Sequence, residues 1–371
     1  MYTWQQPDWP KYRYDIDRHQ SELIQLYGEA QRLRGSLAGL PKELSDIVKS
    51  DAYTDEGLAN AAVEGEYYSR DHVRSSTLVA LGLADASALK GSRKALAIGR
   101  LSIEAMQQAN KPLIANTLHR FHHLALGDDE DPRVGIWRVN KRPLYVVSGA
   151  AGYEEIHFEA PPSAQVKEEI EKFISWYNEE TSQVERPERA FLSSAVAHLY
   201  FETIHPYLDG NGRVGRALAE AALCRQLSFA LPFSISGAIL ERRPVYYAAL
   251  KIGSASLDID EWISFYLNLM EFAMKRLSTL IERTQVRAKV LEQDLNARQR
   301  KVLDKLFVEW PKPLSGGLTA TKYMKMTNSS KATSTRDLQE LLDFGILRRE
   351  GSGRGTRYQL VTAKHIPSKL G

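Results

Sequence analysis

One stretch constrains this chain more than any other, and it reads His205-Pro-Tyr-Leu-Asp-Gly-Asn-Gly-Arg-Val-Gly-Arg216. Apolar residues recur at helical spacing on both sides of it, which predicts a buried helix before it and another after it. Pro206 ends the first helix, and the second starts within the Gly-Asn-Gly run. The stretch is therefore predicted to be a loop that joins two buried helices.

The residues of this loop suit a bound phosphate group. Gly210 and Gly212 allow positive φ angles, so consecutive backbone N–H groups can turn toward an anion at the start of the second helix. Arg213 and Arg216 are three residues apart on one helix face, where both guanidinium groups can reach phosphate oxygens. The sequence thus predicts an anion site at this helix N-terminus.

Two further side chains of the loop supply a metal ligand and a base. Asp209 is a short carboxylate beside the glycines, suited to holding Mg²⁺ against a bound phosphate. His205 has an ordinary pKa near ~6.5, so it can accept a hydroxyl proton near neutral pH. The alternative is a plain glycine turn with a capping aspartate and solvated arginines. A base, an acid and two arginines in one loop favour the phosphate site.

The stretch resembles the signature of the Fic (filamentation induced by cAMP) family, HxFx[D/E]GNGRxxR. Every position agrees except Tyr207, where the family usually has an inward-packing Phe. The resemblance implies a mainly α fold with a Fic-type helical core and a β-hairpin flap. It also implies an N-terminal helical module over 1–95 and a Fic domain over 96–290. The pattern of the C-terminal residues, given below, adds a winged helix-turn-helix domain over 291–371.

What the resemblance implies about activity is transfer of AMP from ATP to a Ser, Thr or Tyr hydroxyl of a target protein. His205 would deprotonate that hydroxyl, and Mg²⁺ would lie on Asp209. The ATP phosphates would be held by Gly210, Asn211, Gly212, Arg213 and Arg216. A kinase-type branch of the family carries Lys where this chain has Gly212, which argues against that activity.

A second motif, Asn60-Ala-Ala-Val-Glu-Gly-Glu66, is on its own a helix end with a solvated glutamate. Beside the loop it resembles the family's inhibitory helix, [S/T]xxxE[G/N], here around residues 56–66. The resemblance implies that Glu64 pairs with Arg216 and denies it to the γ-phosphate of ATP. Asn60 replaces the usual Ser or Thr, and its amide can make a local hydrogen bond. Removal of AMP, with Glu64 activating water, and transfer of another phosphate-containing group are open alternatives.

Strand-like segments lie between these motifs. Residues 136–139 and 144–147 are rich in β-branched and aromatic side chains, and 156–158 follow a Gly-containing turn. They resemble the Fic flap, whose open edge can pair with a strand of the target protein. A simple surface hairpin is the alternative.

Further helices are expected along the chain, over 15–37, 97–124, 166–177, from Pro244, from Asp260 and over 277–295. On the helix from Pro244, the Tyr246-Tyr247 pair resembles the family position that lines the adenine pocket. A core role for these two tyrosines is the alternative.

The C-terminal part has its own pattern and charge. Between Arg298 and Arg357 there are 13 Lys and Arg against 6 Asp and Glu, a net charge of +7 in a chain whose total is +3. Helices near 302–306, 319–324 and 332–344 are followed by strands at 346–349 and 357–360, which is the order of a winged helix-turn-helix. The charge of residues 296–360 suits contact with the phosphate backbone of DNA, with Ser334 and Arg336 on the expected recognition helix and Arg354 on the wing. A dimer or partner interface is the alternative use of this domain. For the whole chain, a DNA-binding transcriptional regulator on a Fic scaffold is the alternative to the enzyme.

Composition limits the remaining possibilities. The 371 residues suggest two or three domains, and no apolar run is long enough to span a bilayer. The first ten residues lack the pattern of a signal peptide. Cys224 is the one cysteine, which excludes disulfides within the chain and fits a cytoplasmic location. Its expected role is a buried, inert thiol. A homodimer and modification of the chain by itself stay open.

Overall fold

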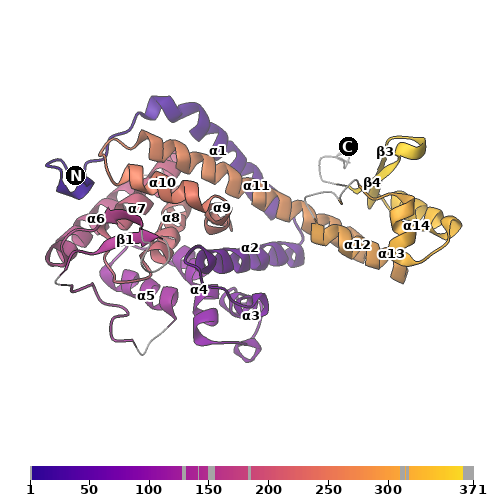
Figure 1. The fold of residues 1–371 in the computed structure, drawn as a ribbon, viewed down its shortest axis with the longest axis horizontal. Helices are drawn as coiled ribbons and strands as arrows, with labels where there is room; N and C mark the ends of the chain where they lie inside the picture. The colour runs from indigo at the N-terminus through magenta and orange to yellow at the C-terminus, as the bar shows by residue number, and fades with distance from the viewer. Residues whose placement is uncertain are drawn as a thin grey trace. The chain divides into compact units, whose positions relative to one another are not determined.

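The computed structural model describes residues 2–127, 131–140, 142–148, 155–182, 185–309, 314 and 317–361 (Figure 1). It is mainly helical and has two antiparallel two-stranded sheets among these residues. The chain divides into two compact units, of which unit 1 is Met1–Ala38 with Lys49–Leu277 and unit 2 is Gly39–Val48 with Ser278–Gly371. The domain limits expected after residues 95 and 290 stay predictions.

Eleven helices run wholly or partly through the described residues of unit 1. They are α1 (Ile16–Ala38), α2 (Lys42–Val63), α3 (Arg70–Ala80), α4 (Arg93–Gln108), α5 (Ala115–Leu126), α6 (Val166–Thr181), α7 (Ala190–Ile204), α8 (Asn211–Leu227), α9 (Ile235–Glu241), α10 (Arg243–Gly253) and α11 (Asp260–Leu291). Within the described ranges, no helix combines the length and apolar character that crossing a membrane requires.

Most helix predictions are confirmed, with two corrections. The stretch expected to be helical over 97–124 is two helices, α4 and α5, because Pro112 lies in the segment between them. The helices expected from Asp260 and over 277–295 are one helix, α11. No Gly or Pro interrupts the residues between them, so the helix continues.

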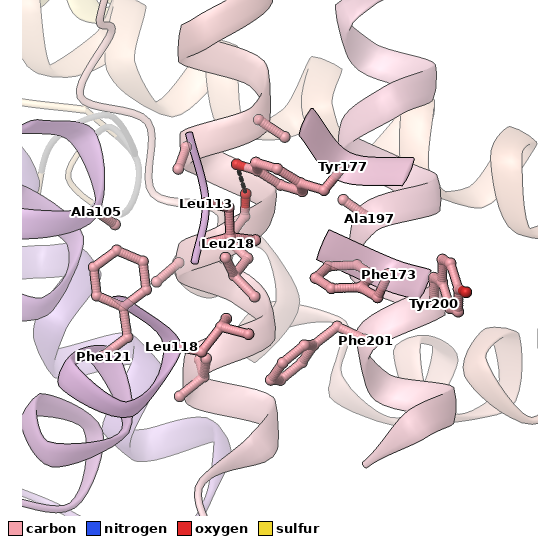
Figure 2. Close-up of a cluster of buried hydrophobic side chains, with 14 of the residues drawn as sticks. Ala105, Leu113, Leu118, Phe121, Phe173, Tyr177, Ala197, Tyr200, Phe201 and Leu218 are labelled. Carbon is pink, nitrogen blue, oxygen red and sulfur yellow. Dashed lines mark hydrogen bonds between the residues drawn. The ribbon is translucent and has the colours of Figure 1, made fainter. Parts of the chain in front are cut away.

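The centre of unit 1 is the helical pair α7 and α8. Every residue of α7 except Glu202 is buried, and most of α8 is buried as well. A helix that is covered on all sides belongs to a core rather than a surface. Figure 2 shows aromatic and aliphatic side chains of neighbouring helices packed against this pair. They include Phe121 of α5 and Phe173 and Tyr177 of α6, in one cluster with Phe201 of α7 and Leu218 of α8.

Cys224 belongs to the same core cluster. Its side chain is 8% exposed, and burial, helped by the nearby Glu220, raises the pKa of the thiol to about 12. A thiol with so high a pKa holds almost no thiolate near neutral pH. The inert thiol predicted from the sequence is therefore what the structure describes.

The hairpin consists of β1 (Tyr145–Ser148) and β2 (Glu155–Glu159), paired antiparallel with an irregularity between Val146 and Val147. Its turn lies outside the described residues. The strand predicted over 136–139 is wrong, because this segment is irregular. Its backbone pairs with the loop after α7 instead, through a bond from the Arg138 N–H to the Pro206 carbonyl at 2.9 Å.

Unit 2 contains a small helical core with a second hairpin. Its elements are α12 (Ala297–Glu309), α13 (Ala320–Thr327), α14 (Lys331–Asp343), β3 (Leu347–Glu350) and β4 (Arg357–Leu360). They follow the predicted order, and β3 pairs antiparallel with β4 from Leu347 opposite Leu360. Ser334 cannot contact DNA as expected, because it is fully buried and bonded to Ser329 at 2.8 Å. Arg336 is exposed, and the Arg354 side chain lies outside the description.

The buried carboxylate of Asp337 on α14 connects the helices of unit 2 through hydrogen bonds. The Arg298 guanidinium donates to both of its oxygens, at 2.7 and 3.0 Å. The Tyr323 hydroxyl and the Asn296 amide donate to it as well, each at 3.0 Å. Burial alone would raise the pKa of Asp337, but these bonds lower it below its usual value.

Candidate active site

The loop between α7 and α8 spans residues 205–210, and we call it the signature loop. Two of its residues have a left-handed backbone conformation. His205 caps α7 with φ 50° and ψ 60°, and Gly210 precedes α8 with φ 78°. The expectation of a positive φ at Gly212 is wrong, because α8 begins at Asn211 and Gly212 lies in its first turn. A residue with a Cβ atom loses roughly 1–2 kcal/mol in the left-handed region, so the surroundings must hold His205 there.

Asn211 fixes the shape of this loop. Its Oδ1 accepts from the Tyr207 N–H at 2.9 Å, and its Nδ2 donates to the Tyr207 carbonyl at 2.8 Å. The Tyr207 ring is fully buried, as expected for the Phe position, and stacks on His122 with centroids 3.7 Å apart. Asn211 therefore shapes the predicted phosphate site through its side chain, which is engaged within the loop.

His122 of α5 supports the same loop, and nothing in the sequence pattern indicated it. Its Nδ1 accepts from the Gly135 N–H at 2.9 Å, so its Nε2 carries the proton and donates to the Asp209 carbonyl at 3.0 Å. Burial lowers the pKa of His122 to about 4, which keeps the ring neutral. The backbone at Asp209 is thereby held from α5.

Asp209 itself points outward. Its carboxylate is 76% exposed and accepts from the Gly210 N–H at 2.6 Å, with an Arg213 nitrogen 3.7 Å away. The described residues contain no cluster of three or more His, Cys, Asp or Glu side chains that could form a metal site alone. A single exposed carboxylate fits Mg²⁺, which commonly binds proteins through one or two carboxylates together with substrate phosphates.

Arg216 is 1% exposed and is bonded to the last turn of α2 and to the residue that follows the helix. It donates to Glu64 at 2.8 Å, to the Asn60 side chain at 2.7 Å and to the Asn60 carbonyl at 3.1 Å. The ion pair that the sequence predicted between Glu64 and Arg216 is present in the structure. The Asn60 amide bonds this distant arginine rather than a local group, and its Nδ2 also donates to the Arg213 carbonyl at 3.4 Å.

A second acidic residue, Glu66, pairs with Arg213 at 2.9 Å. The reason lies in how α2 ends: Gly65 is left-handed at φ 84°, its N–H donates to Ala62, and the Glu66 N–H donates back to Ala61. This is the Schellman arrangement of a helix C-terminus. It places Glu64 and Glu66 on either side of the glycine, each against one arginine of α8. The sequence analysis missed Glu66, although its spacing from Glu64 was visible.

The Glu64 carboxylate also covers the start of α8. A Cβ atom built on Gly212 would lie 2.6 Å from its Oε1, so this oxygen sits directly over the first turn of the helix. The N-terminal turn of a helix attracts anions through its free N–H groups and its dipole. Glu64 therefore occupies an anion position of the kind that the sequence assigned to a phosphate.

Comparison with known proteins agrees with this geometry. Residues 101–223 match the Fic/DOC family, and residues 2–83 match a domain of unknown function, DUF4172. The first match contains the signature loop and both arginines. This chain has a Fic/DOC domain.

Curated relatives match parts of the chain. A probable protein adenylyltransferase of Aquifex aeolicus is 42% identical over 67 residues, 18% of this chain and 19% of that protein. The protein adenylyltransferase fic-1 of Caenorhabditis briggsae is 28% identical over 148 residues, 39% of this chain and 27% of that protein. The chain thus spans less than a third of the length of these relatives.

Solved structures share the fold over much more of the chain. A Fic family protein from Desulfovibrio desulfuricans superimposes with a TM-score of 0.51 at 18% identity, covering 92% of this chain and 96% of that one. A Fic domain containing signaling protein from Bacteroides thetaiotaomicron gives the same score and identity over 71% of this chain and 97% of that one. The Fic-type fold expected from the sequence is confirmed.

Within the Fic domain, the surroundings of His205 set its protonation. Burial, together with the positive charge of Arg138, lowers its pKa to about 4, so the ring is neutral at pH 7. Glu202, one turn earlier on α7, lies 4.0 Å from the Nδ1 atom. Burial raises the pKa of Glu202 to about 8, and within the described structure its Oε1 has no hydrogen-bond partner.

The two tyrosines assigned to the adenine pocket differ in position. Tyr246 is 1% exposed, and its hydroxyl is bonded to His198 at 2.9 Å. That ring is a core residue in this structure, which agrees with the alternative given above, and its part in an adenine pocket stays a prediction. Tyr247 is half-buried beneath the Arg243 guanidinium, 5.7 Å from its ring centroid. Its part in an adenine pocket stays a prediction.

Proposed function

We propose that this protein is a protein adenylyltransferase whose Fic domain is held inactive by its own Glu64. One observation carries the proposal. The Glu64 carboxylate forms an ion pair with the buried Arg216 and lies over the first turn of α8, next to the neutral His205. Such an arrangement is an anion site beside a base, which phosphoryl transfer requires. The curated adenylyltransferases that share sequence with the Fic domain support the same reaction.

In this reaction one side chain transfers a proton and others stabilise the negative charge of the phosphates. His205 takes the proton of a Ser, Thr or Tyr hydroxyl, and the hydroxyl oxygen forms a bond to the α-phosphorus of ATP. The bond to the pyrophosphate breaks, and pyrophosphate leaves with its electron pair. Arg213, Arg216 and the N–H groups at the start of α8 stabilise the phosphate charge. The negative triphosphate would also raise the pKa of His205 from about 4 toward neutrality.

Mg²⁺, held by Asp209 together with phosphate oxygens, would neutralise part of the triphosphate charge when bound. The chain's own contribution is the position of that carboxylate. His122 fixes the Asp209 carbonyl from α5, and the Gly210 N–H orients the carboxylate.

Autoinhibition follows from occupancy of both arginines. Arg216 is held by Glu64 and Asn60, and Arg213 is held by Glu66. A γ-phosphate competing for the same place meets a carboxylate at the first turn of α8, and like charges repel. We infer that the transferase becomes active when residues 60–66 leave α8.

The test uses the purified full chain with Mg²⁺ and ATP labelled at the α-phosphate. The wild type is expected to label itself or a lysate protein weakly, and Glu64→Gly to label more strongly. His205→Ala in that background should abolish labelling while ATP binding persists. A Glu64→Gly variant that binds ATP but transfers nothing would contradict the proposal. Mass spectrometry for peptides carrying AMP identifies the target, and incubation of that product without ATP tests the reverse activity, AMP removal.

A second function is proposed for unit 2, which we expect to bind the phosphate backbone of DNA. One face of α14 is exposed and carries Lys331, Thr335, Arg336 and Gln339. Contacts to phosphates weaken steeply with salt. Replacing Lys331 and Arg336 by Ala in the full chain should weaken binding to duplex DNA and flatten its salt dependence. Lys301→Ala, an exposed lysine of α12, is the matched control. Equal binding by all three proteins would contradict DNA binding through this face.

A further inference from the structure

His205 has a backbone conformation that calls for external support. It is left-handed at φ 50° and ψ 60°, and the residues on either side of it, Ile204 and Pro206, leave their carbonyls without helical partners. Among residues other than glycine, Asn, Asp and His adopt this conformation most often, but it is still strained for a residue with a Cβ atom. The position of the imidazole, and so of the proposed base, depends on what holds these three peptide groups.

Arg138 holds all three. Its Nε donates to the His205 carbonyl at 2.7 Å, its Nη2 reaches the Ile204 carbonyl at 3.5 Å, and its backbone N–H donates to the Pro206 carbonyl at 2.9 Å. A guanidinium is suited to this task because its donors lie in one rigid plane and can bind several acceptors at once. A lysine ammonium in the same place is a point charge without this fork.

The same guanidinium also bonds both ends of the hairpin. Its Nη1 donates to Asn140, which precedes β1, at 2.9 Å, and its Nη2 donates to the carbonyl of Pro161, which follows β2. The hairpin that would receive the target protein and the histidine that would take its proton are thus bonded to one side chain.

Arg138 is buried without a counter-ion. It is 2% exposed, and no acidic residue in the described part of the chain forms an ion pair with it. Burial lowers its pKa to about 10, which still leaves it charged at pH 7. Its charge is balanced by carbonyl oxygens at the C-terminal end of α7, where the helix dipole favours a cation. A buried arginine that serves only packing would be a costly choice, since an apolar side chain could fill the space.

We propose that Arg138 is a positioning residue for the transfer reaction, which fixes the left-handed backbone of His205 and couples it to the hairpin. This inference rests on the proposed transferase function. It also predicts an electrostatic effect, because the charge of Arg138 favours the neutral imidazole. The other charged groups that act on His205 are Glu202 on α7, Glu64 after α2 and Asp209 in the signature loop.

The experiment compares Arg138→Met and Arg138→Lys in the Glu64→Gly background, with Arg142→Met as the control. Arg142 lies in the same segment and is exposed. Arg138→Met should lower kcat about tenfold or more and leave KM for ATP within about twofold, because misplacing a reacting group affects the chemical step. Arg138→Lys should also lower kcat, since lysine keeps the positive charge but lacks the planar set of guanidinium donors. Arg142→Met should retain the parent rate.

A pH profile separates positioning from general instability. Without the Arg138 charge the pKa of His205 rises, so the acid limb of the kcat profile should move to higher pH in Arg138→Met and stay in place in Arg138→Lys. The same titration can be read by NMR on ¹⁵N-histidine protein, with the His205 signal assigned by its loss in His205→Ala. Equal kcat values and equal titrations in Arg138→Met and Arg142→Met would overturn the inference. If the Glu64→Gly parent transfers no AMP, the proposed function fails, while the NMR titration still tests Arg138.

Discussion

Gly65 offers the sharpest test of how residues 60–66 restrain the Fic domain. It is left-handed at φ 84°, and a Cβ atom added to it would meet no atom within 4 Å. Gly65→Ala therefore introduces backbone strain of roughly 1–2 kcal/mol without a steric clash or a change of charge. Both glutamates keep their side chains, so any effect on activity comes from the geometry of the helix end.

The magnitude follows from that strain. If the strain is relieved when residues 60–66 leave α8, the population of the open state rises by a factor of about 5 to 30. The basal rate of AMP transfer should rise by the same factor, up to the rate of Glu64→Gly. The assay is incorporation of label from ATP by the full chain under initial-rate conditions, with ATP affinity measured separately.

The chain contains a matched control for this substitution. Gly82 is left-handed at φ 71°, has no atom within 4 Å of an added Cβ, and ends α3 with the same pair of backbone bonds. Gly82→Ala should lower the unfolding free energy about as much as Gly65→Ala does and leave the transfer rate unchanged. Equal transfer rates in the two variants, with equal loss of stability, would refute a link between this helix end and activity.

Three further predictions follow from the same structure. Glu66→Gln should raise the basal rate only about two- to threefold, because the pair with Arg213 is partly solvated, with Glu66 34% exposed; the labelling assay measures it. Glu202→Gln should flatten the dependence of the unfolding free energy on pH on the alkaline side. The pKa of Glu202 rises from 4.5 to about 8 on folding, so its contribution to the unfolding free energy is present below pH 4.5 and is lost as the pH rises through 8. Urea unfolding at pH 6 and pH 9 measures the difference. Asp337→Ala should lower the unfolding free energy of unit 2 by about 1–3 kcal/mol, since the buried Tyr323 hydroxyl loses its acceptor while Arg298, 37% exposed, stays solvated, and hydrogen exchange over 296–342 should show the loss locally.

The sequence revealed those parts of the site whose chemistry is local. His205, Asp209, Arg213 and Arg216 fall within twelve consecutive residues, and their residue types alone indicate a base and a phosphate site. Gly212 was misassigned because a one-residue difference in where α8 begins decides whether its φ is positive. Pattern analysis places helix ends only within a few residues.

The missed residues are those whose partners are distant in the chain. Arg138 bonds a carbonyl 67 residues away, His122 bonds one 87 residues away, and Glu66 pairs with an arginine 147 residues away. Each looks ordinary in its own segment, and the period of the surrounding pattern carries no information about its partner. Whether Tyr246 is buried could not be decided from the sequence for a related reason, since burial depends on how α10 packs in three dimensions.

The single buried thiol makes this protein convenient for spectroscopy. Cys224 is inert and covered, so a maleimide fluorophore or spin label would react with an introduced surface cysteine and leave the native one untouched. Tyr67, next to Glu66, is 80% exposed and tolerates such a replacement sterically. A label at Tyr67→Cys would follow residues 60–66 in real time as nucleotide or target binds, without prior removal of any cysteine.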